Sequence, residues 1–233
     1  MTIQIRRSDE RGYFDYEWLK TYHTFSFGQY YDPQHINFRS LRVLNEDRVR
    51  PGVGFPIHAH HDMEILSIVL SGSLAHQDDM GNGSILYPGH VQLITAGTGI
   101  THSETNASDK EEVHFLQVWI LPNKKNLSPS YQEKTFNGEV LHNRWALIAS
   151  ENQEENSIKI HQDVKIYLAE LEAGVNLVKE LGEGHSGWLQ IIQGEATLNQ
   201  HLMNAGDGAA ISQITQFEVS AQTPTKLLFF DLS

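Results

Sequence analysis

Turn signals built on glycine recur along the whole chain and divide it into short segments. Examples are Arg50-Pro51-Gly52, Ser71-Gly72-Ser73 and Tyr87-Pro88-Gly89. The apolar runs between such turns, for example residues 65–70, 91–94 and 113–120, are rich in Ile, Val, Leu and aromatic side chains. Runs of this length and composition are typical of β-strands. No long apolar stripe repeats with the 3.6-residue period of a helix, so the sequence predicts an all-β protein with one short helix at residues 16–21.

The two halves of the chain share the same order of features. Each contains a strand, a glycine turn, a strand, a second glycine turn and a further strand, at residues 67–94 in the first half and 189–211 in the second. This repeat predicts two similar β-barrels or sandwiches. A polar stretch that contains Pro122 and Pro129 marks the boundary region, near residues 122–140. We therefore expect an N-terminal domain at residues 1–130 and a C-terminal domain at residues 131–233.

The composition excludes several classes of function. The chain has no cysteine, which rules out disulfides, thiolate nucleophiles and cysteine-ligated metal sites. Its 17 Lys and Arg against 29 Asp and Glu give a formal net charge of −12, the opposite of what a nucleic-acid-binding surface needs. No apolar run has the form of a secretory signal or approaches the roughly 20 residues of a membrane span. We expect a cytoplasmic protein with no membrane or direct nucleic-acid partner.

The 13 histidines make a histidine–carboxylate metal site the main chemical option. His58 and His60 are two residues apart, so on a regular strand they project from one face, which Glu64 would share. His102 and Glu104 form a second pair with the same spacing. On neighbouring strands the two pairs would place three neutral nitrogens and one carboxylate around one point. That set suits a divalent first-row metal and leaves two positions of an octahedral ion open.

Both segments resemble the motifs of the cupin superfamily. The residues that fit the first cupin motif are Gly52, His58, His60 and Glu64. The residues that fit the end of the second motif are Gly99, His102 and Asn106. Two departures stand out: the glycine that closes the first motif is displaced by one position, to Gly72, and Gly97 replaces the usual proline of the second.

The stretch from Thr95 to Glu104, TAGTGITHSE, looks more specifically like the signature of the pirin family. Residues 22–27, 62–65, 76–78 and 117–120 are also similar to that family. The resemblance covers most of residues 1–122, and it reaches the second half mainly through residues 159–163 and the glycine turns.

The resemblance to pirins implies a bicupin, with two double-stranded β-helix barrels of the jelly-roll type. The N-terminal barrel would hold the metal, and the degenerate C-terminal barrel would hold none. The implied metal ligands are His58, His60, His102 and Glu104. Glu64 is not expected to bind the metal, and would at most orient a ligand histidine. The implied cofactor is one divalent ion, Fe(II), with Zn, Cu, Ni, Mn or Co as alternatives.

Some bacterial pirins cleave the flavonol quercetin with O₂, so the leading hypothesis is a metal-dependent dioxygenase of the quercetin 2,3-dioxygenase type. Its partners would be a small aromatic substrate and O₂. Glu104 would act as the general base for the 3-hydroxyl proton, and Phe55 and Trp119 would line the pocket. The alternative is a non-enzymatic, metal-containing pirin that acts as a redox sensor or transcription cofactor and binds a protein partner.

The remaining histidines receive no chemical role from the sequence. His61 would point away from the ligand pair and lie at the surface. His161, His185 and His201 are isolated in the second half, and we expect them in solvent. His76 falls within the same predicted barrel as the ligands but is not assigned.

Overall fold

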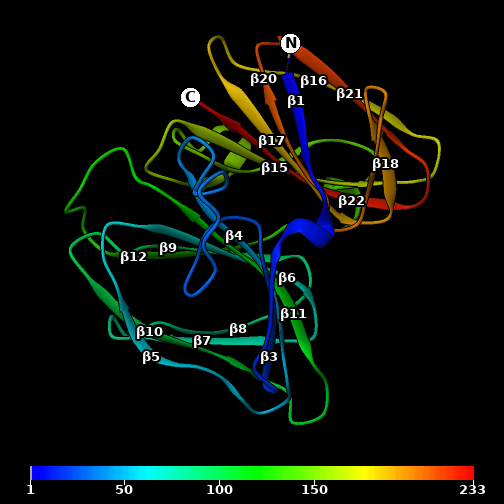
Figure 1. Ribbon diagram of the computed structural model, residues 1–233. Helices are drawn as coiled ribbons and strands as arrows, with labels where there is room; N and C mark the ends of the chain where they lie inside the picture. The colour runs from blue at the N-terminus through cyan, green and yellow to red at the C-terminus, as the bar shows by residue number, and fades with distance from the viewer. Residues whose placement is uncertain (1) are drawn as a thin grey trace. The chain divides into compact units, whose positions relative to one another are not determined.

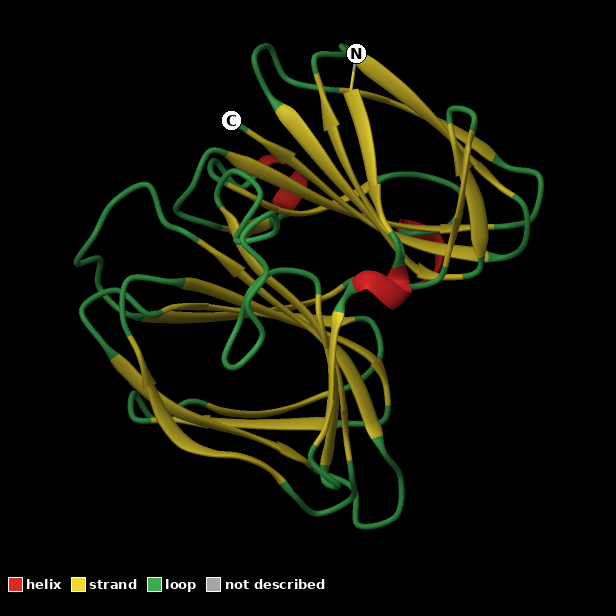
Figure 2. Ribbon diagram, viewed as in Figure 1, coloured by secondary structure: helices red, strands yellow, loops and turns green. Residues whose placement is uncertain are grey.

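The computed structural model describes residues 2–233, and nearly all of their regular structure is β-strand (Figure 2). The three short 3-10 turns are η1 (Ser8–Glu10), η2 (Gly138–Val140) and η3 (Glu154–Asn156). Within residues 2–233, no helix has the length and apolar character needed to cross a membrane. The prediction of an all-β protein is therefore confirmed.

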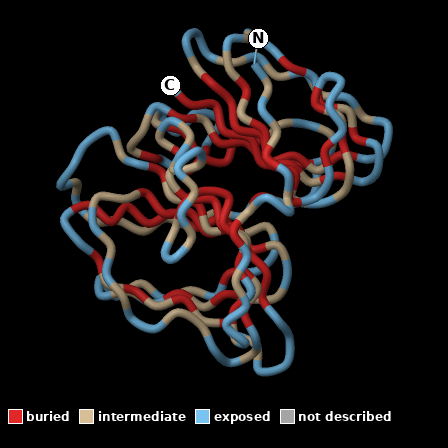
Figure 3. Tube along the Cα trace, viewed as in Figure 1, coloured by how far each residue is buried: buried red, intermediate tan, exposed pale blue. Residues whose placement is uncertain are grey.

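The chain forms two compact units. We call Gly12–Phe136 together with Ile160–Gln162 the N-terminal barrel, and residues 2–11, Asn137–Lys159 and Asp163–Ser233 the C-terminal barrel. Each unit contains one seven-stranded and one four-stranded sheet (Figure 1). In some strands buried and exposed residues alternate, and in others nearly every residue is buried. The buried residues gather along the seven-stranded sheets (Figure 3).

The N-terminal barrel is antiparallel throughout. Its seven-stranded sheet has the order β12-β9-β6-β11-β4-β3-β2. These strands are β2 (Gly12–Asp15), β3 (Leu19–His23), β4 (Leu41–Val49), β6 (Glu64–Ser71), β9 (His90–Thr95), β11 (Val113–Ile120) and β12 (Ser130–Thr135). The four-stranded sheet, in the order β5-β10-β7-β8, consists of β5 (Gly54–His60), β7 (Leu74–Asp78), β8 (Gly83–Leu86) and β10 (Ile100–Asn106).

The C-terminal barrel repeats this two-sheet plan, except that one of its strand pairs is parallel. Its larger sheet has the order β1-β20-β17-β22-β15-β13-β14 and its smaller one the order β16-β21-β18-β19. The larger sheet consists of β1 (Thr2–Arg6), β13 (Ala146–Ser150), β14 (Ile158–Lys159), β15 (Val164–Leu171), β17 (Ser186–Gln193), β20 (Gly208–Ser212) and β22 (Thr225–Leu232). The smaller sheet consists of β16 (Asn176–Glu180), β18 (Glu195–Leu198), β19 (His201–Asn204) and β21 (Gln216–Ala221).

Strand pairing divides the chain differently from the boundary expected after residue 130. β12 pairs with β9, so residues up to Phe136 stay with the N-terminal barrel. β1 pairs with β20 along its whole length, so the first residues of the chain complete the C-terminal sheet. Both differences arise from backbone hydrogen bonds between segments that are distant in sequence.

The prediction of a helix at residues 16–21 is wrong. Glu17 has a positive φ of 68°, and the Trp18 N–H donates to the Tyr16 carbonyl at 2.8 Å, so this region is a turn. β3 then begins at Leu19, and its buried residues, Leu19, Thr21 and His23, alternate with more exposed ones. A period of two places one face of the strand in the barrel, which a helix over the same residues cannot do.

Candidate metal centre

Three of the four predicted ligands meet at one point. β5 and β10 are paired, with His102 opposite His58. The ring centroid of His58 lies 4.7 Å from that of His60 and 4.5 Å from that of His102. One ligand atom from each of the three rings lies within 4.8 Å of the others. The strand period therefore brings His58 and His60 to the same face, as predicted, and strand pairing adds His102.

Burial keeps two of these imidazoles neutral near pH 7, as a metal ligand must be. Burial lowers the pKa of His60 to about 4 and that of His102 to about 3, helped by the neighbouring histidines. Nδ1 of His58 lies 2.8 Å from the Pro56 carbonyl, which can only accept, so Nδ1 carries the hydrogen and Nε2 is left as a donor atom for a metal. Nε2 of His102 is buried and has no hydrogen-bond partner within residues 2–233. This set fits a divalent transition-metal ion.

Glu104, the fourth predicted ligand, lies beside this cluster and is held by three side chains. Its Oε1 accepts hydrogen bonds from the Ser67 hydroxyl at 2.8 Å and from Nε2 of Gln92 at 2.6 Å. Its Oε2 accepts from Nε2 of Gln117 at 2.6 Å. One carboxylate oxygen of Glu104 lies within 4.8 Å of a ring nitrogen of His76 and of a ring nitrogen of His102. It does not form such a close group with all three rings of the His58, His60 and His102 cluster. The structure thus gives Glu104 a fixed orientation at the edge of the cluster.

A close backbone approach positions Glu104. The pairing of β10 with β5 shifts register between His102 and Glu104, which leaves Glu104 opposite Phe55. A Cβ at Gly54 would overlap the backbone oxygen of Glu104. Glycine at position 54 therefore permits the two strands to meet at this bulge.

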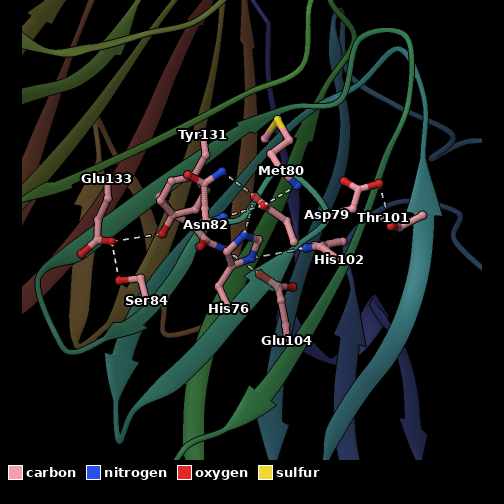
Figure 4. Close-up of polar contacts among 12 residues, drawn as sticks. His76, Asp79, Met80, Asn82, Ser84, Thr101, His102, Glu104, Tyr131 and Glu133 are labelled. Carbon is pink, nitrogen blue, oxygen red and sulfur yellow. Dashed lines mark hydrogen bonds and ion pairs between the residues drawn. The ribbon is translucent and has the colours of Figure 1, made fainter.

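His76 adds a second buried imidazole behind His102 (Figure 4). The Nδ1 atoms of the two rings are 3.5 Å apart, and Nε2 of His76 is 3.2 Å from Oδ2 of Asp78. Asn82 donates to Asp78 from its backbone at 2.9 Å and from its side chain at 2.9 Å. The ring of Tyr131 stacks on His76 with 4.7 Å between centroids. This arrangement limits the rotation of His102.

Glu64 does not share the face of His58 and His60. β5 ends at His60, Asp62 has a positive φ of 48°, and Glu64 begins β6 in the other sheet. Its carboxylate is fully buried, where Oε2 accepts from the Thr95 hydroxyl at 3.2 Å and from the His161 N–H at 3.3 Å. The turn at residues 61–63 therefore separates Glu64 from the predicted ligands.

A cavity of about 440 Å³ opens beside the cluster. His58, His60 and Glu104 line it, together with the predicted residues Phe55 and Trp119. The ring of Trp119 makes edge contacts with His60 at 4.9 Å and with Phe27 at 5.2 Å. The further lining residues are Tyr16, Leu19, Thr21, His23, Phe27, Gly28, Gln29, Asn45, Asp47, Pro56 and Gln117. Most of the exposed surface of this wall is apolar, although many of the lining residues are polar, which suits a flat organic ligand with a few polar groups.

Burial also shifts the pKa values of two polar side chains that line this cavity. It lowers the pKa of His23 to about 4 and raises the pKa of Asp47 to about 7. His23 is therefore a neutral imidazole near pH 7.

Several site residues were missed by the sequence reading. Ser67, Gln92 and Gln117 lie inside apolar strand runs, where an isolated polar residue indicates a buried partner. His76 and Asp78 show the same two-residue spacing as the ligand pairs, and that spacing was their available signal.

Two of the histidines expected in solvent are paired and partly buried. His185 Nδ1 lies 3.0 Å from Oδ1 of Asp231, and the side chain is only 17% exposed. His161 lies 3.4 Å from Oε1 of Glu64. Both histidines are drawn out of solvent by a buried carboxylate, because buried Glu64 and Asp231 each need a nearby hydrogen-bond donor.

Family models match both halves of the chain. Residues 4–120 match the model described as Pirin, and residues 147–232 match the model described as Quercetinase C-terminal cupin domain. The chain is 37% identical over 230 residues to a protein named quercetin 2,3-dioxygenase from Escherichia coli (strain K12), covering 99% of this chain and 98% of that protein. It is 36% identical over 230 residues to a pirin-like protein from Caulobacter vibrioides, covering 98% and 99%.

Solved structures show the same likeness. The crystal structure of the bacterial pirin YhhW from Escherichia coli in complex with nickel(II) has a TM-score of 0.95 and 37% sequence identity, covering 99% of both chains. The nickel complex, with the histidine cluster found here, supports a site for one metal ion. The two barrels are thus the two halves of a bicupin. The chain belongs to the pirin family.

Proposed function

We propose that this protein is a metal-dependent dioxygenase that cleaves a flavonol or a similar enolic phenol with O₂. The observation that carries the proposal is a cluster of three histidines that borders a cavity with aromatic residues in its wall. The name of the Escherichia coli relative supports the same reaction class. The flavonol itself is part of the proposal.

His58, His60 and His102, with Glu104 beside them, would hold one divalent ion, Fe(II) in this proposal. When bound, the ion supplies Lewis acidity toward an enolic hydroxyl and a centre for O₂ chemistry. The histidines act as neutral ligands and move no proton in this scheme. Their orientation is set by the Pro56 carbonyl behind His58 and by His76 behind His102.

Glu104 is the proposed general base. A carboxylate has about four lone-pair positions, and three are occupied by donors from Ser67, Gln92 and Gln117. The remaining position would hold a metal ion and, once Glu104 loosens from the ion, would accept the substrate 3-hydroxyl proton. The three donors hold this position in one direction, which keeps the base within reach of a bound hydroxyl.

The cavity walls orient the substrate and exclude water. Trp119 and Phe27 meet edge to face, and Phe55 packs edge to face on Trp18 at 5.2 Å. A flat phenol held between such rings presents its hydroxyl edge to Glu104. Removal of the 3-hydroxyl proton makes the ring electron-rich, so that O₂ can add. Both oxygen atoms enter the products, and one ring carbon leaves as CO.

The test is O₂ uptake with a panel of flavonols, using protein loaded anaerobically with one defined metal at a time. We expect catalytic O₂ consumption matched by CO release with at least one metal. The His102→Ala variant is the matched inactive control. Absence of turnover with every metal would contradict the enzyme and favour the protein-partner role.

A further inference from the structure

A row of five polar residues crosses the seven-stranded sheet of the N-terminal barrel. Each residue pairs with the next on five neighbouring strands: His23, Asn45, Gln117, Ser67 and Gln92. Residues at paired positions project from the same face of a sheet. The row therefore lies on one face of the sheet, the face that carries Gln117 and Ser67 to Glu104.

Only part of this row is satisfied by the protein. Gln117, Ser67 and Gln92 all donate to Glu104. On the outer strands the row continues without such a partner, and a second same-face pair follows two residues along. The four residues of these two pairs, which we call the β3–β4 patch, are Thr21, His23, Asn45 and Asp47.

The β3–β4 patch combines deep burial with unused hydrogen-bonding atoms. None of its residues is more than 5% exposed, and all four line the cavity. One side-chain atom of each is buried and makes no hydrogen bond of standard geometry within residues 2–233: Thr21 Oγ1, His23 Nδ1, Asn45 Oδ1 and Asp47 Oδ1. The Thr21 and Asp47 side chains do contact each other across the two strands, and His23 contacts the Phe27 backbone. Buried polar atoms are nearly always hydrogen-bonded, because leaving them unpaired is costly. Asn45 Oδ1 is unpaired among the described residues and the three atoms beside it are incompletely bonded, so this cavity wall points to a ligand.

The chemistry of the patch defines that ligand. Oδ1 of Asn45 and Oδ1 of Asp47 accept hydrogen bonds, and the neutral His23 brings no positive charge. The patch therefore has no cation for an anionic ligand and calls for hydrogen-bond donors. Uncharged hydroxyl groups on an aromatic framework match both these acceptors and the aromatic walls.

We propose that the β3–β4 patch recognises hydroxyl groups of the phenolic ligand that lie outside the reacting ring. This inference rests on the proposed function, because it takes the reacting hydroxyl to lie at Glu104. The patch is then a specificity device: it selects polyhydroxylated ligands over those of the same shape that lack the remote hydroxyls. A site that hydrogen-bonds a ligand hydroxyl discriminates against an analogue without it, because the buried acceptors stay unpaired.

The test measures binding without turnover. Nickel-loaded protein, kept free of O₂, is titrated with quercetin and with galangin, the flavonol that lacks the two B-ring hydroxyls. Calorimetry and quenching of tryptophan fluorescence report the dissociation constants. We expect the wild type to prefer quercetin by about tenfold or more, the scale of one buried hydrogen bond.

The variants Thr21→Val and Asp47→Asn conserve shape and remove or alter one hydrogen-bonding group each. We expect each to reduce the preference to about threefold or less while leaving galangin affinity within about twofold of wild type. Lys20→Gln, on the exposed side of the same strand, is the matched control and should keep the full preference. Metal content and thermal unfolding are recorded for each variant. If Asp47→Asn does not fold, Thr21→Val alone decides the result.

An unchanged preference in both variants would overturn the assignment, as would an equal loss of both ligands, which indicates a structural role. A wild type that binds neither flavonol overturns it as well. Preference for quercetin without O₂ turnover would refute the dioxygenase and leave the recognition patch standing. Turnover without any preference for quercetin would refute the recognition patch and leave the dioxygenase standing.

Discussion

Nε2 of Gln117 donates a 2.6 Å hydrogen bond to Oε2 of Glu104, one of three side-chain hydrogen bonds through which Glu104 joins the two sheets of the N-terminal barrel. Gln117 lies on β11 and Glu104 on β10. The contact fixes the carboxylate on the side that Ser67 and Gln92 do not reach, since those two bind the other oxygen. The orientation of Glu104 thus depends on residues far from it in sequence.

We predict that Gln117→Leu weakens metal binding by about 10- to 100-fold, the usual effect of removing a group that orients a ligand. The measurement is the metal dissociation constant from competition with a chelator. Gln77→Leu, at an exposed position on β7, is the control and should bind metal like the wild type. Unchanged affinity in the Gln117 variant would show that Glu104 does not depend on this contact.

The ligand set makes a second prediction. His102→Ala should lose bound metal while keeping the β-structure, because it removes the ring that strand pairing brings to His58. His61→Ala should keep the metal, since His61 is 57% exposed and contacts only Asp62 among the ion pairs of residues 2–233. Metal analysis after dialysis and far-ultraviolet circular dichroism check both. Stoichiometric metal in the His102 variant would refute the site.

Glu104 and Glu64 should respond differently to the same substitution. Glu104→Gln keeps an oxygen ligand but removes the charge and the base, so we expect partial metal retention and much lower flavonol turnover. Burial raises the pKa of Glu64, and its partners are Thr95 and His161, so Glu64→Gln should have a milder effect. Steady-state kinetics and metal content separate the two. Equal losses at both positions would support Glu64 as a ligand or as an essential group that orients one.

Asp47 predicts a pH dependence of stability. Burial raises its pKa to about 7 from 3.8, so the folded protein keeps a proton that the unfolded chain has released. The free energy of unfolding should therefore fall as pH rises from about 4 to about 7. Asp47→Asn should remove this pH dependence. Because a pKa shift of one unit corresponds to about 1.4 kcal/mol, the substitution should raise the free energy of unfolding at pH 8 by at most about 4 kcal/mol.

Urea unfolding of the wild type and of Asp47→Asn across this pH range tests the prediction. Asp109→Asn, at an exposed position, is the control and should follow the wild-type profile. A variant profile as steep as that of the wild type would place the titrating group elsewhere.

The C-terminal barrel should bind no metal, which gives a fifth prediction. Substituting His185 and His201 together with alanine should leave about one ion per chain, the number expected for a single histidine–carboxylate set. The double variant should unfold at a lower temperature, because Asp231 loses its partner His185. Two ions in the wild type that fall to one in the double variant would contradict this assignment.

Local features of the sequence determined the strands and the ligand pairs. Side chains two residues apart share a face of a strand wherever that strand lies, so His58 and His60 could be paired without a structure. The same rule predicted that His102 and Glu104 project together, and both are buried on β10. The glycine turns and apolar runs were sufficient to predict the all-β fold, because they report on short stretches of chain. The pirin resemblance added the bicupin arrangement.

Only the tertiary structure decided which strands lie side by side. The turn at Asp62 moves Glu64 into the other sheet, although the spacing of the motif had suggested a shared face. The row from His23 to Gln92 draws one residue from each of five strands, and no local period connects them. Strand register depends on hydrogen bonds between segments that are distant in sequence. The residues that hold Glu104, and the cavity wall that faces the ligand, could therefore be identified only from the tertiary structure.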